Sequence, residues 1–260
     1  MRILFQLLIL SISIFSTLNS YAAAFSWQKV SFITQSFHEV ALGSEYGKGD
    51  YRIRKWVKPI NIFVQHDIGD SHLQNQLVDA HIQHLSSITQ LTIKRVSTIA
   101  QANLKFFFTD QKNLLPLITK HSGSAVAKVN TTKTCIANIS LNQKAQVRSA
   151  QIYIPVDFAY RKGKLVACIV EELTQILGLP RDSEKVYPSI FNDKSTDDLL
   201  TGLDETLIRI LYSPKIKAGM TKNSLSKVLV SVINQLNHSG LISTANRRVK
   251  QTKLYAMLGY

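Results

Sequence analysis

The chain has 260 residues, of which 45% are hydrophobic and 18% are charged. This globular composition excludes wholesale disorder, collagen-like repeats and coiled coil. Two cysteines exclude a disulfide-dense mini-protein and a Cys-rich zinc module. With 31 Lys and Arg against 17 Asp and Glu, the formal net charge is +14, and the length allows one substantial domain.

The first 24 residues have the three parts of a secretory signal peptide. Arg2 precedes an apolar run, Ile3 to Leu18, and small residues follow at 22–24. The run is shorter and more interrupted than a membrane span, which needs about 20 apolar residues; an uncleaved N-terminal anchor is the alternative. We expect a periplasmic or secreted protein without an integral membrane segment after signal removal, and without a lipoprotein anchor because no Cys lies near the cleavage region.

Export to an oxidising compartment determines how the two cysteines are interpreted. Cys135 and Cys168 are expected to form a disulfide, since paired thiols are the usual state in secreted domains. Two buried free thiols are the alternative.

Three segments in the first half of the chain have the pattern of β-strands. Residues 59–64 alternate as a half-buried strand does, and residues 104–108 are strongly apolar. Residues 151–155 end in Pro155, which places that strand at an edge or ends it there.

The segments around these strands are less uniform in pattern. A helix is predicted from Ser71, where apolar residues recur at helical spacing. Residues 25–57 show no strong period. The polar stretch 120–146 predicts a long excursion tethered by Cys135.

The second half of the chain is helical in pattern. A core-facing stripe predicts a helix over 165–177, with Gly178 as its C-terminal cap and Pro180 as its stop. A second helix is predicted after Ser195 and a third after Ser224. Strands first and helices afterwards indicate an α+β domain.

The expected organisation is a signal peptide over 1–24, one domain over 25–236 and a basic C-terminal tail over 237–260. The tail is expected to be loose, because its last twenty residues carry four bases, Arg247, Arg248, Lys250 and Lys253.

The most informative segment is Cys168-Ile-Val-Glu-Glu-Leu-Thr-Gln-Ile-Leu-Gly-Leu-Pro-Arg181. Zinc peptidases place His-Glu-x-x-His on a helix, because two imidazoles four residues apart grip one metal and the Glu acts as base. Here Glu171 stands at the first His, Glu172 matches the catalytic Glu, and Gln175 replaces the second His. In the longer metzincin pattern, Arg181 replaces the third His.

Over residues 165–220 the chain resembles one bacterial family, the exported domain-of-unknown-function 2927 family. The segments that carry this resemblance are the helix above, Tyr187-Pro-Ser-Ile-Phe-Asn-Asp193, and Leu211-Tyr-Ser-Pro214 through Gly219-Met220. As a group this family looks like a degenerate relative of the zincin peptidases.

The resemblance implies a zincin-like α+β fold, with a small mixed sheet packed on a site helix and a helical C-terminal half. It also implies which residues form the site. Glu172 and Glu171 are the candidate catalytic residues, and the candidate binding residues are Gln175, Arg181, Asp182, Asn192 and Asp193.

The sequence offers no convincing metal site, and no cofactor is expected. Gln is a poor zinc ligand and Arg181 would repel a cation, although a hard cation held by carboxylates is chemically easier. His81 and His84 lack a third ligand and are interpreted as an ordinary helix pair. The acids near Ser195 have some EF-hand spacing, but Asp198 stands where that loop needs Gly, so a helix N-terminus is favoured.

The charge distribution separates the candidate site from the rest of the chain. Residues 171–205 hold nine acids and three bases, whereas the rest of the mature chain holds 27 bases and eight acids. We therefore expect a non-catalytic binding or accessory domain whose partner is an anionic envelope component or another envelope protein. The alternatives are a carboxylate-based hydrolase of an envelope polymer, with Asp182 or Asp193 as second carboxylate, and a polyanion-binding module. A nucleic acid partner is not expected.

Overall fold

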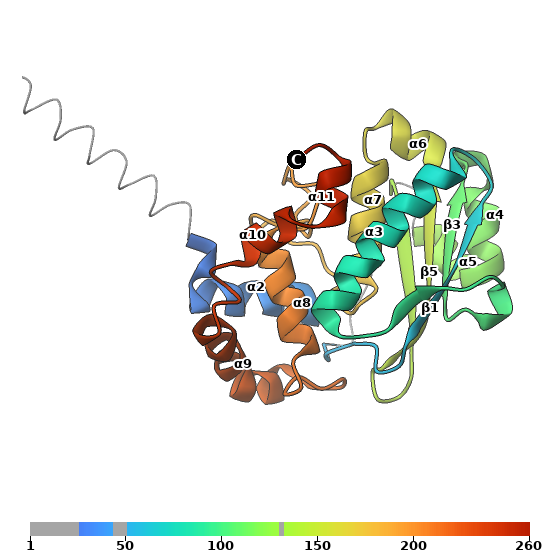
Figure 1. Cartoon of the computed structure of the whole chain (residues 1–260). Helices are drawn as coiled ribbons and strands as arrows, with labels where there is room; N and C mark the ends of the chain where they lie inside the picture. The colour runs from blue at the N-terminus through green and yellow to red at the C-terminus, as the bar shows by residue number, and fades with distance from the viewer. Residues whose placement is uncertain (1–25, 44–50, 130–132) are drawn as a thin grey trace, which may run out of the picture.

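The computed structural model describes residues 26–43, 51–129 and 133–260 (Figure 1). The predicted signal peptide lies outside these residues. Among the described helices, none combines the length and apolar character that crossing a membrane requires.

The core of the fold is a five-stranded mixed sheet with the strand order β2-β1-β3-β5-β4. Its strands are β1 (Ile60–His66), β2 (Ile93–Arg95), β3 (Leu104–Thr109), β4 (Ile136–Leu141) and β5 (Val147–Pro155). Only β4 runs antiparallel to its neighbour; the other pairings are parallel. The three predicted strands are confirmed as β1, β3 and β5. Strands β2 and β4 were not predicted, because one is three residues long and the other is a half-buried edge strand.

Both faces of the sheet are covered, which explains why consecutive residues of β3 and β5 are buried. Successive strand residues point to opposite faces, so Phe107 and Tyr153 pack with the α4 side chains Leu114 and Ile118. Phe106 and its alternating neighbours belong to the larger core on the other face. Helices α4 (Gln111–Ser122) and α5 (Ser124–Val129) lie on the first face, and α3 (Ser71–Thr89) and α7 (Leu165–Gln175) cover the second (Figure 1).

The described parts of the polar stretch 120–146, residues 120–129 and 133–146, contain regular structure that was not predicted. They contain the end of α4, the short helix α5 and strand β4. The Cys135–Cys168 disulfide is confirmed and joins the start of β4 to α7, with the two Cα atoms 5.7 Å apart.

The remaining elements are helical. They are η1 (Ser26–Gln28), α2 (Val30–Leu42), η2 (Ile99–Gln101), α6 (Val156–Arg161), α8 (Gly202–Tyr212), α9 (Lys222–His238), α10 (Ala245–Lys250) and α11 (Lys253–Met257). The predicted mixed sheet, the helix over 165–177 and the helical C-terminal half are therefore confirmed. The sequence analysis missed α2, which buries Ile33, Phe37 and Val40.

Two predicted helix starts are wrong, because other residues supply the caps. Helix α8 begins at Gly202, where Thr201 and Asp204 form a reciprocal capping box, and not after Ser195. Helix α9 begins at Lys222 under a Thr221 cap, two residues before Ser224.

The last twenty residues are not a loose tail. Val249 and Leu254 are buried in the core, and the Tyr255 hydroxyl donates to the Leu200 carbonyl at 3.0 Å. The Arg248 guanidinium contacts the buried carboxylate of Glu205 on α8 at 2.8 Å. The segment is basic, yet one of its bases, Arg248, forms an ion pair inside the fold.

Candidate functional site

The candidate site lies along one face of α7. Cys168, Glu171, Glu172 and Gln175 follow the helical spacing that puts residues on a common side. The other side of the helix packs into the core through Ile169 and its neighbours. Glu171, Glu172 and Gln175 therefore form a polar stripe on a mainly apolar helix, and the Cys168 disulfide lies before them on the same side.

The chain turns sharply at the end of α7, and Gly178 makes that turn possible. Its φ is +120°, and a Cβ built there would lie 1.9 Å from the Arg54 carbonyl oxygen, so no other residue fits. The Trp56 indole N–H donates to the Ile176 carbonyl at 2.8 Å and closes the last turn. The following residues return along the helix, which brings Asp182 beside Gln175.

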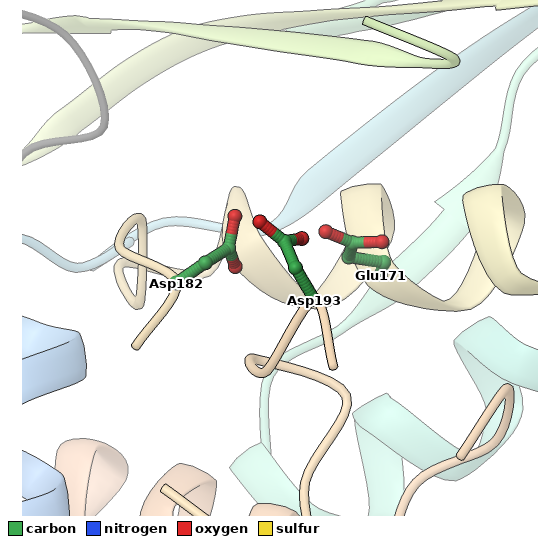
Figure 2. A group of neighbouring side chains, drawn as sticks. All are labelled: Glu171, Asp182 and Asp193. Atoms are coloured by element: carbon green, nitrogen blue, oxygen red, sulfur yellow. The ribbon is translucent and has the colours of Figure 1, made fainter. Parts of the chain in front are cut away.

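Three carboxylates converge at this point. Glu171, Asp182 and Asp193 each offer an oxygen within 4.8 Å of the others. Figure 2 shows the three groups facing a common space from α7, from the segment after it and from a more distant loop. The Gln175 amide nitrogen donates to Asp182 at 2.9 Å and to Glu171 at 3.3 Å. Gln175 therefore bridges two of the three acids.

A pocket of about 180 Å³ opens beside these groups. The disulfide forms part of its wall, next to Glu171 and Glu172. The lining is mainly polar, with five acids and two lysines, and it consists of Lys133, Thr134, Cys135, Lys164, Ala167, Cys168, Glu171, Glu172, Ile190, Asn192, Asp193, Ser195, Asp197 and Asp198.

A buried carboxylate holds the loop that carries Asp193. Asp204 accepts from the Ser189 hydroxyl at 2.5 Å and from the Ile190 N–H at 3.2 Å. Burial raises the pKa of Asp204 to about 6, although these hydrogen bonds act in the opposite direction. The Asn192 side-chain amide donates a hydrogen bond to the Val186 carbonyl at 2.9 Å, which stabilises the loop. Asn192 also lines the pocket.

The fold brings most of the predicted site residues together at the pocket beside α7, with the exception of Arg181. Glu171, Glu172, Asn192 and Asp193 line the pocket, while Gln175 and Asp182 join it through the hydrogen bonds above. Arg181 instead pairs with Glu39 of α2 at 3.3 Å. The prediction that Arg181 would repel a cation from this site is therefore weakened by its position.

One ion pair in the pocket lining was not predicted from the sequence. Lys164 lies 2.7 Å from Asp198, a residue that was interpreted as part of a helix start. Lys133 also lines the pocket. No local pattern predicts a role for either lysine, since Lys133 stands in a polar stretch and Lys164 is one of three bases between residues 161 and 164.

The donor set determines which metal the site suits. Three carboxylates are the ligands of a hard cation such as Ca²⁺, whereas zinc sites in proteins are built mainly from Cys and His. The His81 and His84 pair does not supply a zinc site. The His81 ring nitrogen lies 3.1 Å from the Val170 carbonyl and from the Thr174 hydroxyl, and burial lowers its pKa to about 3.

Comparison with known proteins identifies one family. Residues 31–231 match the family model described as a protein of unknown function, DUF2927. No match is found among the curated proteins.

Proposed function

This chain belongs to the DUF2927 family, and from that premise we propose that it is an exported, non-catalytic accessory domain of the cell envelope with zincin-like architecture. Helix α7 keeps the Glu-x-x-x-x-x-Gly frame of the zincins and lacks each of its His residues. The observation that carries the proposal is the Gln175 amide, which donates to both Glu171 and Asp182. A hydrogen-bond donor therefore stands where the frame has a metal-binding imidazole.

The acidic pocket defines the chemistry of the ligand. Its wall holds Glu171, Glu172 and Asp193, so a basic or neutral group is favoured over an anion. In the envelope, such a group is carried by a basic segment of another protein or by an amine-bearing envelope component. The protein would act by holding that partner, with no bond broken.

Metal analysis of the exported protein tests the non-catalytic proposal. We expect no tightly held zinc in the purified chain; one zinc per chain would overturn it. The double substitution Glu171→His with Gln175→His restores two imidazoles four residues apart beside Asp182. If the architecture is zincin-like, this variant gains stoichiometric zinc, whereas Lys227→His with Ser231→His on α9 binds only weakly. Equal zinc uptake by both variants would contradict the zincin-like architecture.

A carboxylate-based hydrolase is the second candidate, because Glu171 lies close to both Asp182 and Asp193. Carboxyl groups about 5 Å apart are the arrangement of a retaining glycosidase. Glu172, 4% exposed in the same pocket wall, is the candidate proton donor.

Clearing of purified peptidoglycan separates the two candidates. The accessory role predicts no clearing by the wild-type protein. Clearing that disappears in a folded Glu172→Gln variant, and survives in a control Glu184→Gln variant on the exposed loop, would establish the hydrolase instead.

A further inference from the structure

Three segments that are far apart in the sequence meet around residues 52–55. The Ile53 N–H donates to the Met220 carbonyl at 2.8 Å, and the Gly219 N–H donates to the Ile53 carbonyl at 2.8 Å. On the other side of the segment that follows Tyr51, Lys55 pairs with Gln146 in a short parallel bridge. The segment therefore lies between the β4–β5 connection and the connection that leads into α9 (Figure 1).

Each of the three segments brings exposed or half-exposed cations to this junction. We call Arg52, Lys144, Lys217 and Lys222 the basic face. Arg52 is opposite Thr221 in an antiparallel bridge, and its guanidinium donates to the Gln143 carbonyl at 3.4 Å. These contacts place Arg52 beside Lys222 and beside Lys144.

The three segments are rich in bases, although Glu39 of α2 lines one groove with Tyr51 and Lys222. Residues 51–58, 141–149 and 212–229 together contain ten bases and no Asp or Glu. Among the ion pairs of the described residues, none involves Lys144, Lys217 or Lys222. Lys144, Lys217 and Lys222 therefore contribute a positive potential at this junction.

A buried ammonium adds to that potential from below. Lys55 is 9% exposed, and its Nζ donates to the Leu211 and Ile216 carbonyls at 2.7 and 3.1 Å. Burial and, to a lesser extent, the nearby charge of Lys217 lower its pKa to about 8. Lys55 remains mostly protonated at pH 7, so the interior under the basic face is also positive.

We propose that the basic face docks the protein onto an anionic phospholipid bilayer. Its cations are spread over three segments, which suits many headgroups better than one small anion. Tyr51, 64% exposed beside Arg52, supplies the amphipathic ring that lies at headgroup level. Each base near an anionic surface adds about tenfold or less to binding, and the gain falls steeply with salt. This goes beyond the proposed function, since none of these residues lines the α7 pocket.

Vesicle co-sedimentation of the exported protein tests the docking surface. We expect binding to vesicles of phosphatidylcholine with 30% phosphatidylglycerol (roughly the anionic content that gives a negative surface potential) and none to phosphatidylcholine alone. The triple variant Lys144→Gln, Lys217→Gln, Lys222→Gln should weaken binding by about 100-fold. These side chains are exposed, so the thermal midpoint should not change.

The matched control removes the same charge elsewhere. Lys120→Gln, Lys128→Gln, Lys250→Gln, also exposed, should weaken binding by less than about tenfold, because distant charges are screened. An equal loss in both triple variants would overturn the proposal in favour of net charge alone. Tighter binding to soluble polyphosphate than to the vesicles, with the same dependence on the basic face, would replace the bilayer with a soluble polyanion. Zinc content reports on the α7 proposal separately.

Discussion

At the scale of single residues, Gly178 connects the site helix to the rest of the site. Its positive φ costs other residues free energy, and the Arg54 carbonyl occupies the place of its side chain. The turn directs Asp182 back towards Gln175, whose side-chain amide donates to the Asp182 carboxylate at 2.9 Å. The glycine thus serves the geometry of the carboxylates as well as the end of the helix.

We expect Gly178→Ala to lower the free energy of unfolding by more than about 2 kcal/mol, because both strain and a backbone clash are introduced. Gly163 is the matched control, since it has a φ of +66° and open space around its Cβ position. Gly163→Ala should cost only about 1 kcal/mol. Urea unfolding measures both variants, and equal costs would contradict the role of the Arg54 carbonyl.

At the scale of elements, α3 carries two histidines against its neighbours. His81 faces α7, where it contacts Val170 and Thr174. His84 is half-buried, and burial lowers its pKa to about 4 despite the nearby charge of Glu205. Both rings are therefore neutral in the folded protein over the range in which free histidine takes up a proton.

We expect the free energy of unfolding to fall as the pH is lowered from about 6.5 to 4. In this window the histidines bind protons in the unfolded chain and remain neutral in the folded protein. The free energy of unfolding therefore changes by up to about 1.4 kcal/mol per pH unit for each histidine. Asp204 changes the free energy of unfolding in the opposite direction, because its pKa in the folded protein is raised to about 6. One carboxyl group does not offset two histidines.

Urea unfolding at several pH values checks this dependence. His81→Asn should reduce the slope, whereas His72→Asn, at an exposed position on the same helix, should leave it unchanged. Indistinguishable slopes for the wild type and His81→Asn would show that His81 is not the group responsible.

At the scale of the whole molecule, the C-terminal segment closes the fold against α8. Glu205 is 1% exposed, and its carboxylate pairs with the guanidinium groups of Arg209, at 2.7 Å, and Arg248, at 2.8 Å. Arg248 also donates to the Leu241 carbonyl at 2.6 Å. A buried carboxylate that loses one such partner is destabilised strongly.

We expect Arg248→Met to lower the free energy of unfolding by about 2–3 kcal/mol, since Arg209 still partners the carboxylate. Arg247 is adjacent and exposed, so Arg247→Met should change stability by less than about 0.5 kcal/mol. If chemical denaturation gave the same value for both variants, the contacts of Arg248 would not be what stabilises the fold.

The elements predicted from sequence are those with a strong local pattern. Strand β3 is an apolar run, β1 alternates as a half-buried strand does, and α7 has a complete core stripe followed by Gly178 and Pro180. Strand β4 was missed because it is stabilised by its pairing with β5. The start of α8 was misplaced because Ser195 and Asp198 have the same spacing as Thr201 and Asp204, which form the actual cap.

The sequence by itself determined the apolar framework, the disulfide partners and the glutamates of the site helix, because these depend on composition and on spacing within one element. Only the tertiary structure decided that Asp182 and Asp193 join Glu171 while Arg181 turns to Glu39, and that Arg248 is taken into the fold. It also brought bases from three distant segments onto one face. Such groupings depend on long-range packing, which brings side chains together irrespective of their separation along the chain.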